Sequence, residues 1–328
     1  MNDLKNETFE ENENLTPTVE ENYTTESVSN TDILAQAVMR EKDMQQVANK
    51  QRVMKILVQI GLYLFLAIMA VIVVFPFYWM IISSLKTLKE YELKNPTFFP
   101  QEFNWVNYSN AFNKANMGRL FLNTLFVGVV STLLSLVVTI LAAFAFSRLN
   151  FKGRDTLFGF LLATMMIPGE LFTITNYITV NRLDWMNTYT VLIVPFLVSV
   201  FYIYLLKQNF QQIPNELYLA AKVDGTSDFK YLWKVMIPLA LPTLISITIL
   251  KMMGAWNTYM WPKLTTTNPD YYLITIGLRE AFSGADVKQP DIPLQMAAVT
   301  LVSLPLFMVF IFLRKYIMKG VSRSGIKG

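Results

Sequence analysis

Six long stretches of mostly apolar residues dominate this sequence and restrict the folds that it can adopt. A helix needs about 20 such residues to cross the hydrocarbon core of a bilayer. Stretches of this kind cover residues 56–83, 120–146, 156–180, 189–206, 241–261 and 293–316. The first begins too deep in the chain for a signal peptide, and no small-residue cleavage pattern follows it closely. The sequence therefore predicts an all-α membrane protein with six transmembrane helices.

The composition excludes several kinds of chemistry. Charged residues make up 16% of the chain, against about 25% in an average soluble domain. The 328 residues include no cysteine and no histidine. A disulfide framework, a thiolate nucleophile and a His/Cys metal site are therefore excluded, and the commonest general acid–base group is missing. We predict no catalytic residue and no metal site.

Basic residues near the ends of the spans predict the orientation of the chain. The flanks on the side of both termini hold 15 Lys and Arg residues, and the opposite flanks hold nine. Because cytoplasmic loops carry the excess of such residues, we expect both termini in the cytoplasm.

The two ends of the chain differ from its middle. Residues 1–32 hold nine acidic residues and one lysine, a composition typical of a solvated, disordered arm. We predict a disordered acidic tail over 1–50, with a regulatory or docking role as the alternative. The first transmembrane helix and an external loop follow over 51–118, then a five-helix core over 119–318 and a cytoplasmic tail over 319–328.

A segment between the fourth and fifth spans has the pattern of two short helices joined by a turn. Pro214 suits a helix start, and Glu216 places negative charge in the first turn, where the helix dipole favours it. Gly225 provides a C-terminal stop, and Thr226 or Ser227 can cap a second helix. We therefore predict a cytoplasmic helix–turn–helix loop.

The first of these helices has little side-chain bulk on one patch. Its apolar and polar residues at helical spacing include Ala220, Ala221 and Asp224. The small alanines allow close approach by a partner protein. An amphipathic helix that rests on the membrane surface explains the same pattern, and the residues alone do not decide between the two.

Lys251 lies near the middle of the fifth apolar stretch. A charge at that depth costs about 2.5–3.5 kcal/mol on insertion scales unless it faces water or a partner. We assign Lys251 to a translocation pathway, together with Trp256 and Asn257 of the same stretch. The alternatives are a lysine that snorkels from an offset span and a tryptophan of the interfacial aromatic belt.

The loop resembles the conserved cytoplasmic loop of ABC-importer permeases. That motif reads Glu-Ala-Ala, three residues, Gly, nine residues, Ile, one residue, Leu-Pro. Here Leu219-Ala220-Ala221 is followed at the same spacing by Gly225 and then by Val-Met-Ile-Pro at 235–238. Leu219 replaces the usual glutamate, so a charged contact from that position is not carried over.

Three further segments resemble the carbohydrate branch of these permeases, typified by the smaller permease subunit of bacterial maltose importers. They are Thr-Met-Met-Ile-Pro-Gly-Glu at 164–170, Gly-Ala-Trp-Asn-Thr-Tyr-Met-Trp-Pro at 254–262 and the terminal 320–328. The resemblance covers nearly the whole chain after residue 55. It implies the type I importer permease fold in a bacterial cytoplasmic membrane.

The resemblance also implies partners and a mechanism. A second permease subunit, two ATPase subunits and an external solute-binding protein are expected to assemble with this chain in the bilayer, and a sugar is the expected substrate. The predicted ATPase-coupling residues are Glu216, Ala220, Ala221, Asp224 and Gly225. No Gly-x-x-x-x-Gly-Lys-Ser/Thr segment is present, so ATP is expected on the partner ATPases and no cofactor on this chain.

Other functions remain open from the sequence. The nearest alternative is a permease for another small solute, such as an amino acid, phosphate or an osmolyte. A membrane-embedded enzyme would need convergent ionisable residues within the spans. A channel or secondary transporter would work without an ATPase. No nucleic-acid partner is expected.

Overall fold

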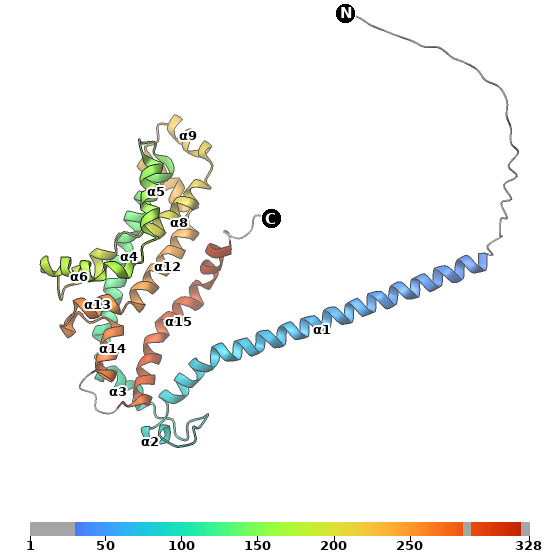
Figure 1. Cartoon of the computed structure of the whole chain (residues 1–328), viewed down its shortest axis with the longest axis horizontal. Helices are drawn as coiled ribbons and strands as arrows, with labels where there is room; N and C mark the ends of the chain where they lie inside the picture. The colour runs from blue at the N-terminus through green and yellow to red at the C-terminus, as the bar shows by residue number, and fades with distance from the viewer. Residues whose placement is uncertain (1–29, 285–289, 323–328) are drawn as a thin grey trace, which may run out of the picture. The chain divides into compact units, whose positions relative to one another are not determined.

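A computed structural model describes residues 30–284 and 290–322 of the chain, as helices and the loops between them (Figure 1). No β-strand occurs within these described ranges. The chain divides into two compact units, residues 1–72 and 73–328. The described part of the first unit is the N-terminal part of helix α1.

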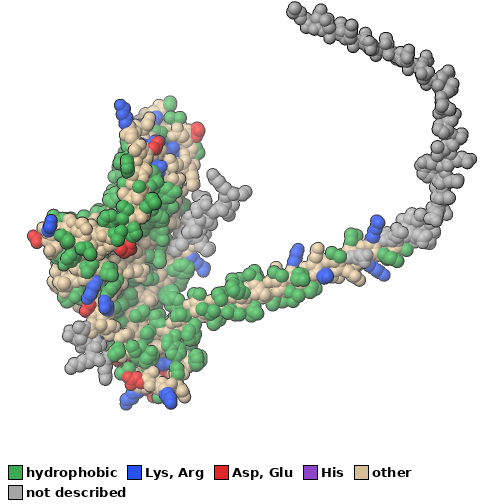
Figure 2. Space-filling view, viewed as in Figure 1, with side chains coloured by type: hydrophobic (Ala, Val, Ile, Leu, Met, Phe, Trp, Pro, Cys, Tyr) green, Lys and Arg blue, Asp and Glu red, His purple; other side chains and the backbone are tan. Residues whose placement is uncertain are grey.

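Helix α1 runs over Asn30–Ser84. Within the first unit, the N-terminal part of α1 carries Lys and Arg side chains, and hydrophobic side chains cover the part of the helix that follows (Figure 2). The structure differs from the predicted disordered tail in that residues 30–50 are helical. That stretch contains neither Pro nor Gly, so nothing in it terminates the helix that the apolar stretch begins. The other residues of the tail, 1–29, lie outside the described residues.

The second unit contains the remaining α-helices. The first seven are α2 (Leu88–Tyr91), α3 (Val106–Lys114), α4 (Met117–Arg148), α5 (Arg154–Thr164), α6 (Thr173–Arg182), α7 (Tyr189–Ile193) and α8 (Val200–Gln211). The others are α9 (Asn215–Val223), α10 (Asp228–Tyr231), α11 (Ile237–Leu239), α12 (Leu241–Asn257), α13 (Met260–Thr265), α14 (Ile274–Ser283) and α15 (Ile292–Ser322). Helix α15 includes the start of the predicted tail 319–328, and residues 323–328 lie outside the described residues.

Three spans that the sequence predicts as continuous are interrupted. Residues 156–180 divide between α5 and α6, which form a pair bent by 85°, because Pro168 lacks an N–H and disfavours a helical residue before it. Residues 189–206 divide between α7 and α8 with a bend of 45°, and the Ser199 side chain caps the new helix. The fifth span ends as a helix at Asn257, because Thr258 is extended, and Trp261 belongs to α13.

The structure is compatible with the six spans that the sequence predicts. Three helices of the described chain are long and apolar enough to cross a membrane, and counting each bent pair as one span gives up to six. Helix α4 packs against α8 and α12, and α12 also packs against α15. These long helices form the scaffold on which the shorter elements lie.

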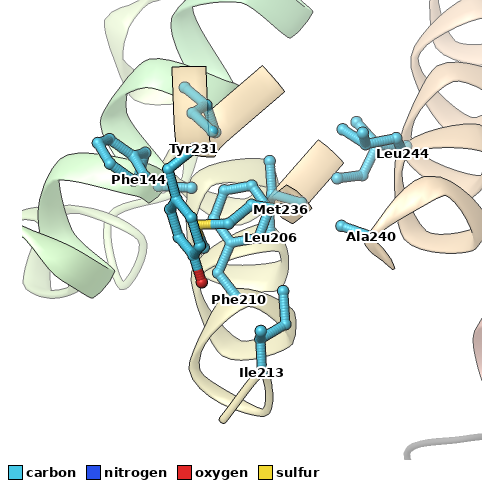
Figure 3. Packing of buried hydrophobic residues seen from close by; sticks show 11 residues of the cluster. Phe144, Leu206, Phe210, Ile213, Tyr231, Met236, Ala240 and Leu244 are labelled. Carbon is cyan, nitrogen blue, oxygen red and sulfur yellow. The ribbon is translucent and has the colours of Figure 1, made fainter. Parts of the chain in front are cut away.

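One buried cluster joins the scaffold to the segment between α8 and α12. We call it the loop-base cluster: Ala143, Phe144, Leu206, Phe210, Ile213, Tyr231, Leu232, Met236, Ala240, Leu244 and Ile247. Figure 3 shows Tyr231, Met236, Leu206 and Phe210 side by side at its centre. Tyr231 and Met236 are essentially inaccessible to solvent. The segment after α8 is therefore fixed to the helical scaffold by its own apolar side chains.

Candidate functional site

The turn after α9 has the hydrogen bonds of a Schellman motif. Gly225 adopts a left-handed backbone conformation with φ of +70°. Its N–H donates to the Lys222 carbonyl at 3.1 Å, and the Thr226 N–H donates to the Ala221 carbonyl at 2.8 Å. These bonds satisfy carbonyls that the helix end leaves unpaired. Glycine is required here by the backbone, as the sequence indicated.

A polar bracket joins α9 to α10 across this turn. The Asp228 carboxylate accepts a hydrogen bond from the Tyr218 hydroxyl at 2.8 Å and pairs with the Lys222 ammonium at 2.7 Å. The Lys222 and Tyr218 hydrogen bonds hold the pKa of Asp228 below its ordinary value. Ser227 caps α10 by accepting from the Lys230 N–H. The two short helices are thus held at a fixed angle.

Arg148, at the end of α4, ties the same segment to a second long helix. One guanidinium nitrogen donates to the carbonyls of Phe210 at 2.8 Å and Ile213 at 2.5 Å. The other donates to the Asn215 side chain at 3.2 Å. These acceptors lie at the end of α8 and the start of α9, so one side chain links α4, α8 and α9. Arg148 is one of the basic residues that predict the orientation of the chain, and no local sequence pattern predicts this second role.

The five predicted coupling residues do not all lie on the same surface. Glu216, Ala220, Asp224 and Gly225 are exposed, whereas Ala221 is partly buried against the loop-base cluster. Ala220 and Ala221 therefore have different surroundings, which the sequence pattern did not separate.

Exposed apolar side chains accompany these residues. Leu219 and Val223 of α9 expose 55% and 89% of their surface, and Phe229 and Trp233 expose 63% and 51%. The Phe229 and Trp233 rings lie 6.0 Å apart. This aromatic pair was not among the predicted site residues, although the four-residue spacing of two large aromatic residues beside the motif was a signal for it.

Lys251 lies at a pocket of about 330 Å³ within the helical scaffold. Its ammonium donates a hydrogen bond to the Phe196 carbonyl. That carbonyl is available because the helix is interrupted between α7 and α8, where backbone acceptors lose their helical partners. The pocket is also lined by Tyr202 of α8 and Trp261 of α13. No sequence pattern groups these two aromatic residues with Lys251.

Trp256 and Asn257 do not line this pocket. Trp256 is buried in a different cluster, where its ring lies 5.9 Å from that of Phe121. Asn257 is exposed, and its amide donates to the Met253 carbonyl at 2.9 Å. The structure therefore does not bring these two residues together with Lys251. In the described part of the chain, no three or more His, Cys, Asp or Glu side chains lie together in a group that could hold a metal ion.

Comparison with known proteins assigns this chain to a family. Residues 135–323 match the model of the binding-protein-dependent transport system inner membrane component. The chain belongs to that family. This permease is 30% identical over 274 residues to the inner membrane ABC transporter permease protein YcjP of Escherichia coli, covering 82% of the present chain and 97% of the relative. The family that the sequence predicted is confirmed.

Two further similarities concern a sugar system and the fold. The permease is 28% identical to the diacetylchitobiose uptake system permease protein NgcG of Streptomyces coelicolor, over 79% of the chain and 86% of the relative. It resembles, with a TM-score of 0.73, a crystal structure of a bacterial ABC transporter involved in the import of the acidic polysaccharide alginate. That match has 22% identity and covers 78% of this chain and 95% of the other. The type I importer permease fold that the sequence predicted is confirmed.

Proposed function

We propose that this permease subunit moves a sugar or oligosaccharide into the cytoplasm by alternating access, driven by ATP hydrolysis on partner subunits. The segment 214–231 is the single feature that best supports this proposal. It is a short helical element with an exposed apolar face and a base that is buried between the long helices.

The bonds within this segment suit the transmission of movement. The Schellman turn and the Asp228 bracket make α9 and α10 one body, and Tyr231 seats that body in the loop-base cluster. Arg148 extends the connection to α4. Because packed interiors transmit displacement, a push on α9 is passed to the ends of α4 and α8. ATPase closure would then rock the long helices between two states.

The proposed roles of the coupling residues follow from their exposure. Ala220 allows close approach by the ATPase, Glu216 and Asp224 offer polar contacts beside it, and Gly225 sets the direction in which α9 ends. Ala221 lies on the inner, partly buried face of α9, where it packs on the loop-base cluster and helps to hold the helix in place. Leu219 replaces the glutamate of the motif with an apolar contact.

The assembly that we propose contains this chain, a second permease subunit, two ATPase subunits and an external binding protein. ATP binds the ATPases, and this chain is a transport subunit without an active site or cofactor of its own. Both termini lie in the cytoplasm, and the six spans cross the bacterial plasma membrane. The name of the diacetylchitobiose relative supports a sugar over other small solutes.

Affinity purification of the tagged full-length chain from its native membranes tests the proposal. Ala220→Trp adds bulk at an exposed position of α9 and should abolish recovery of the ATPase while the second permease is retained. The matched control is Lys152→Trp, at an exposed position of the loop between α4 and α5, which should recover both. Uptake by the isolated chain in vesicles without any ATPase would refute the importer function.

Uptake in reconstituted vesicles tests the class of substrate. The complete transporter with its binding protein should accumulate a sugar in preference to amino acids, phosphate and osmolytes at equal concentration. Accumulation of one of the other solutes, with no sugar taken up, would establish the alternative permease function.

A further inference from the structure

The pocket beside the α7–α8 break has an unusual electrostatic composition. Lys251 is the one charged residue among its lining residues within the described chain. Its single observed hydrogen-bond partner in that part of the chain is the neutral Phe196 carbonyl. No carboxylate lies within 4.0 Å of its ammonium among the described residues, since the four ion pairs there involve other side chains.

This arrangement leaves a positive charge only partly satisfied. An ammonium has three N–H donors, and the Phe196 carbonyl occupies one of them. A carbonyl orients the ammonium but does not neutralise it. Helix α8, which has 12 residues, also begins at the pocket, where Ser199 is both its cap and a lining residue. The positive end of its dipole adds to the potential of Lys251.

The remaining pocket surface suits a sugar ring. Phe196, Tyr202 and Trp261 supply aromatic surface, and the Phe196 and Trp261 rings meet edge-on at 5.7 Å. Ser131, Ser199 and Thr258 supply hydroxyl groups. A volume of about 330 Å³ falls in the range of small-ligand sites, which combine apolar walls with a few placed polar groups.

We propose that this pocket binds the carboxylate of an acidic sugar, with Lys251 as the group that selects a uronic acid over its neutral counterpart. The proposal rests on the proposed importer function and names the substrate class of that function. The ammonium forms a charge-assisted hydrogen bond to the carboxylate, and the Phe196 carbonyl keeps the ammonium directed into the pocket.

The number of charges favours a carboxylate over a phosphate. A single lysine matches one negative charge, and the lining contains no arginine to bind a phosphate in the bidentate manner. A carboxylate of the second permease subunit could satisfy the same ammonium. The two occupants differ in their consequences, because loss of a subunit contact weakens assembly and loss of a ligand contact changes selectivity.

A cysteine placed in the pocket measures occupancy directly. The chain contains no cysteine, so Val198→Cys, at an exposed position of the pocket lining, introduces its only thiol. The assembled transporter in lipid nanodiscs is treated with a water-soluble thiol reagent, and modification of this chain is followed by mass spectrometry. The protecting probes are digalacturonate and the matching neutral digalactoside, and Val106→Cys, exposed on α3, is the control.

The expected result is protection by digalacturonate at a concentration on the order of tenfold to a hundredfold below that of the neutral probe, the range of a charge-assisted hydrogen bond. Adding Lys251→Gln should remove this difference, and adding Lys251→Arg should retain most of it. Val106→Cys should be modified at the same rate with either probe.

Two results would overturn the inference. Equal protection by the two probes with Lys251 present means that the pocket does not select charge. Loss of the second permease subunit from the Lys251→Gln complex means that Lys251 pairs with that subunit. In both cases ATP-dependent uptake of a neutral sugar would leave the importer function intact, whereas absence of an associated ATPase would remove the function itself.

Discussion

Replacement of Gly225 by alanine should loosen the end of α9 by a calculable amount. Gly225 has φ of +70°, and nothing lies within 4 Å of a Cβ built at this position. The cost is therefore backbone strain without a steric clash, about 1–2 kcal/mol for an L-residue in the left-handed region. Gly225→Asn should cost less, since asparagine tolerates this region better than alanine does.

Hydrogen exchange of the backbone amides measures this change locally. The Gly225 and Thr226 N–H groups donate the two bonds of the Schellman turn, so their protection reports its opening. One to two kcal/mol corresponds to a factor of roughly 5–30 in an equilibrium. We expect exchange at residue 226 to accelerate by that factor in Gly225→Ala and by less in Gly225→Asn, with sugar transported per ATP falling in the same order.

A glycine in a regular helix provides the control. Gly159 of α5 also has nothing within 4 Å of an added Cβ, and its φ is not positive. Gly159→Ala should leave exchange at residue 226 unchanged. Equal exchange in wild type and Gly225→Ala, or faster exchange in Gly225→Asn than in Gly225→Ala, would refute the argument from backbone strain.

Three other substitutions test the supports of the site and the packing of the helical scaffold. In Arg148→Lys, the lysine has no planar group that can hold three acceptors. The substitution should lower the sugar transported per ATP in vesicles and leave recovery of the ATPase in affinity purification unchanged. Asp228→Asn removes the ion pair with Lys222, which at this exposure contributes no more than about 1 kcal/mol. The pKa of Asp228 is lowered in the folded chain, so its contribution is present above the ordinary pKa and is lost as the pH falls through the folded value. The protection factors of the amides in the wild-type turn, which compare exchange with the intrinsic rate at the same pH, should therefore fall in acid, and those of Asp228→Asn should not. Gly277→Ala places a Cβ 2.3 Å from Leu120 Cδ1 and should lower stability by about 1–3 kcal/mol in thermal unfolding.

Each of these outcomes has a contrary result. A transport ratio for Arg148→Lys equal to that of wild type would remove Arg148 from the coupling path. Parallel acid profiles for wild type and Asp228→Asn would show that another group titrates. Thermal unfolding of Gly277→Ala at the wild-type temperature would mean that Leu120 can move aside, and Gly159→Ala is the matched control without neighbours.

Much of the fold could be predicted because lipid imposes a simple length rule. Apolar stretches of about 20 residues locate spans with little reference to tertiary contacts. The bend angles at Pro168 and near Ser199 could not be predicted from the sequence, because proline within a span is tolerated wherever other groups satisfy the backbone. The bends of 85° and 45° depend on which neighbours pack there.

In the candidate site, the roles that depend on residues nearby in the sequence could be predicted, and those that depend on distant residues could not. Pro214, Gly225 and Ser227 act on backbone within a few residues, so their roles in starting and ending helices were readable. Arg148 acts 62 to 67 residues away along the chain, and no local pattern identifies such a partner. Lys251 was noticed because charge is rare within a span, but its pocket requires α8 and α13 to lie beside α12.

The exposed face of α9 leads to a last prediction about how an ATPase is held. Leu219 and Val223 are four residues apart and therefore lie on one face of the helix, with 55% and 89% of their surface exposed. If their burial replaces the charge of the motif glutamate, attachment should depend little on salt, since screening acts on exposed charges. We expect equal ATPase recovery at 0.05 and 0.5 M NaCl for the wild-type chain, and salt-sensitive recovery for Leu219→Glu. Loss of the ATPase from the wild-type chain at high salt would show instead that charged groups such as Glu216 dominate the contact.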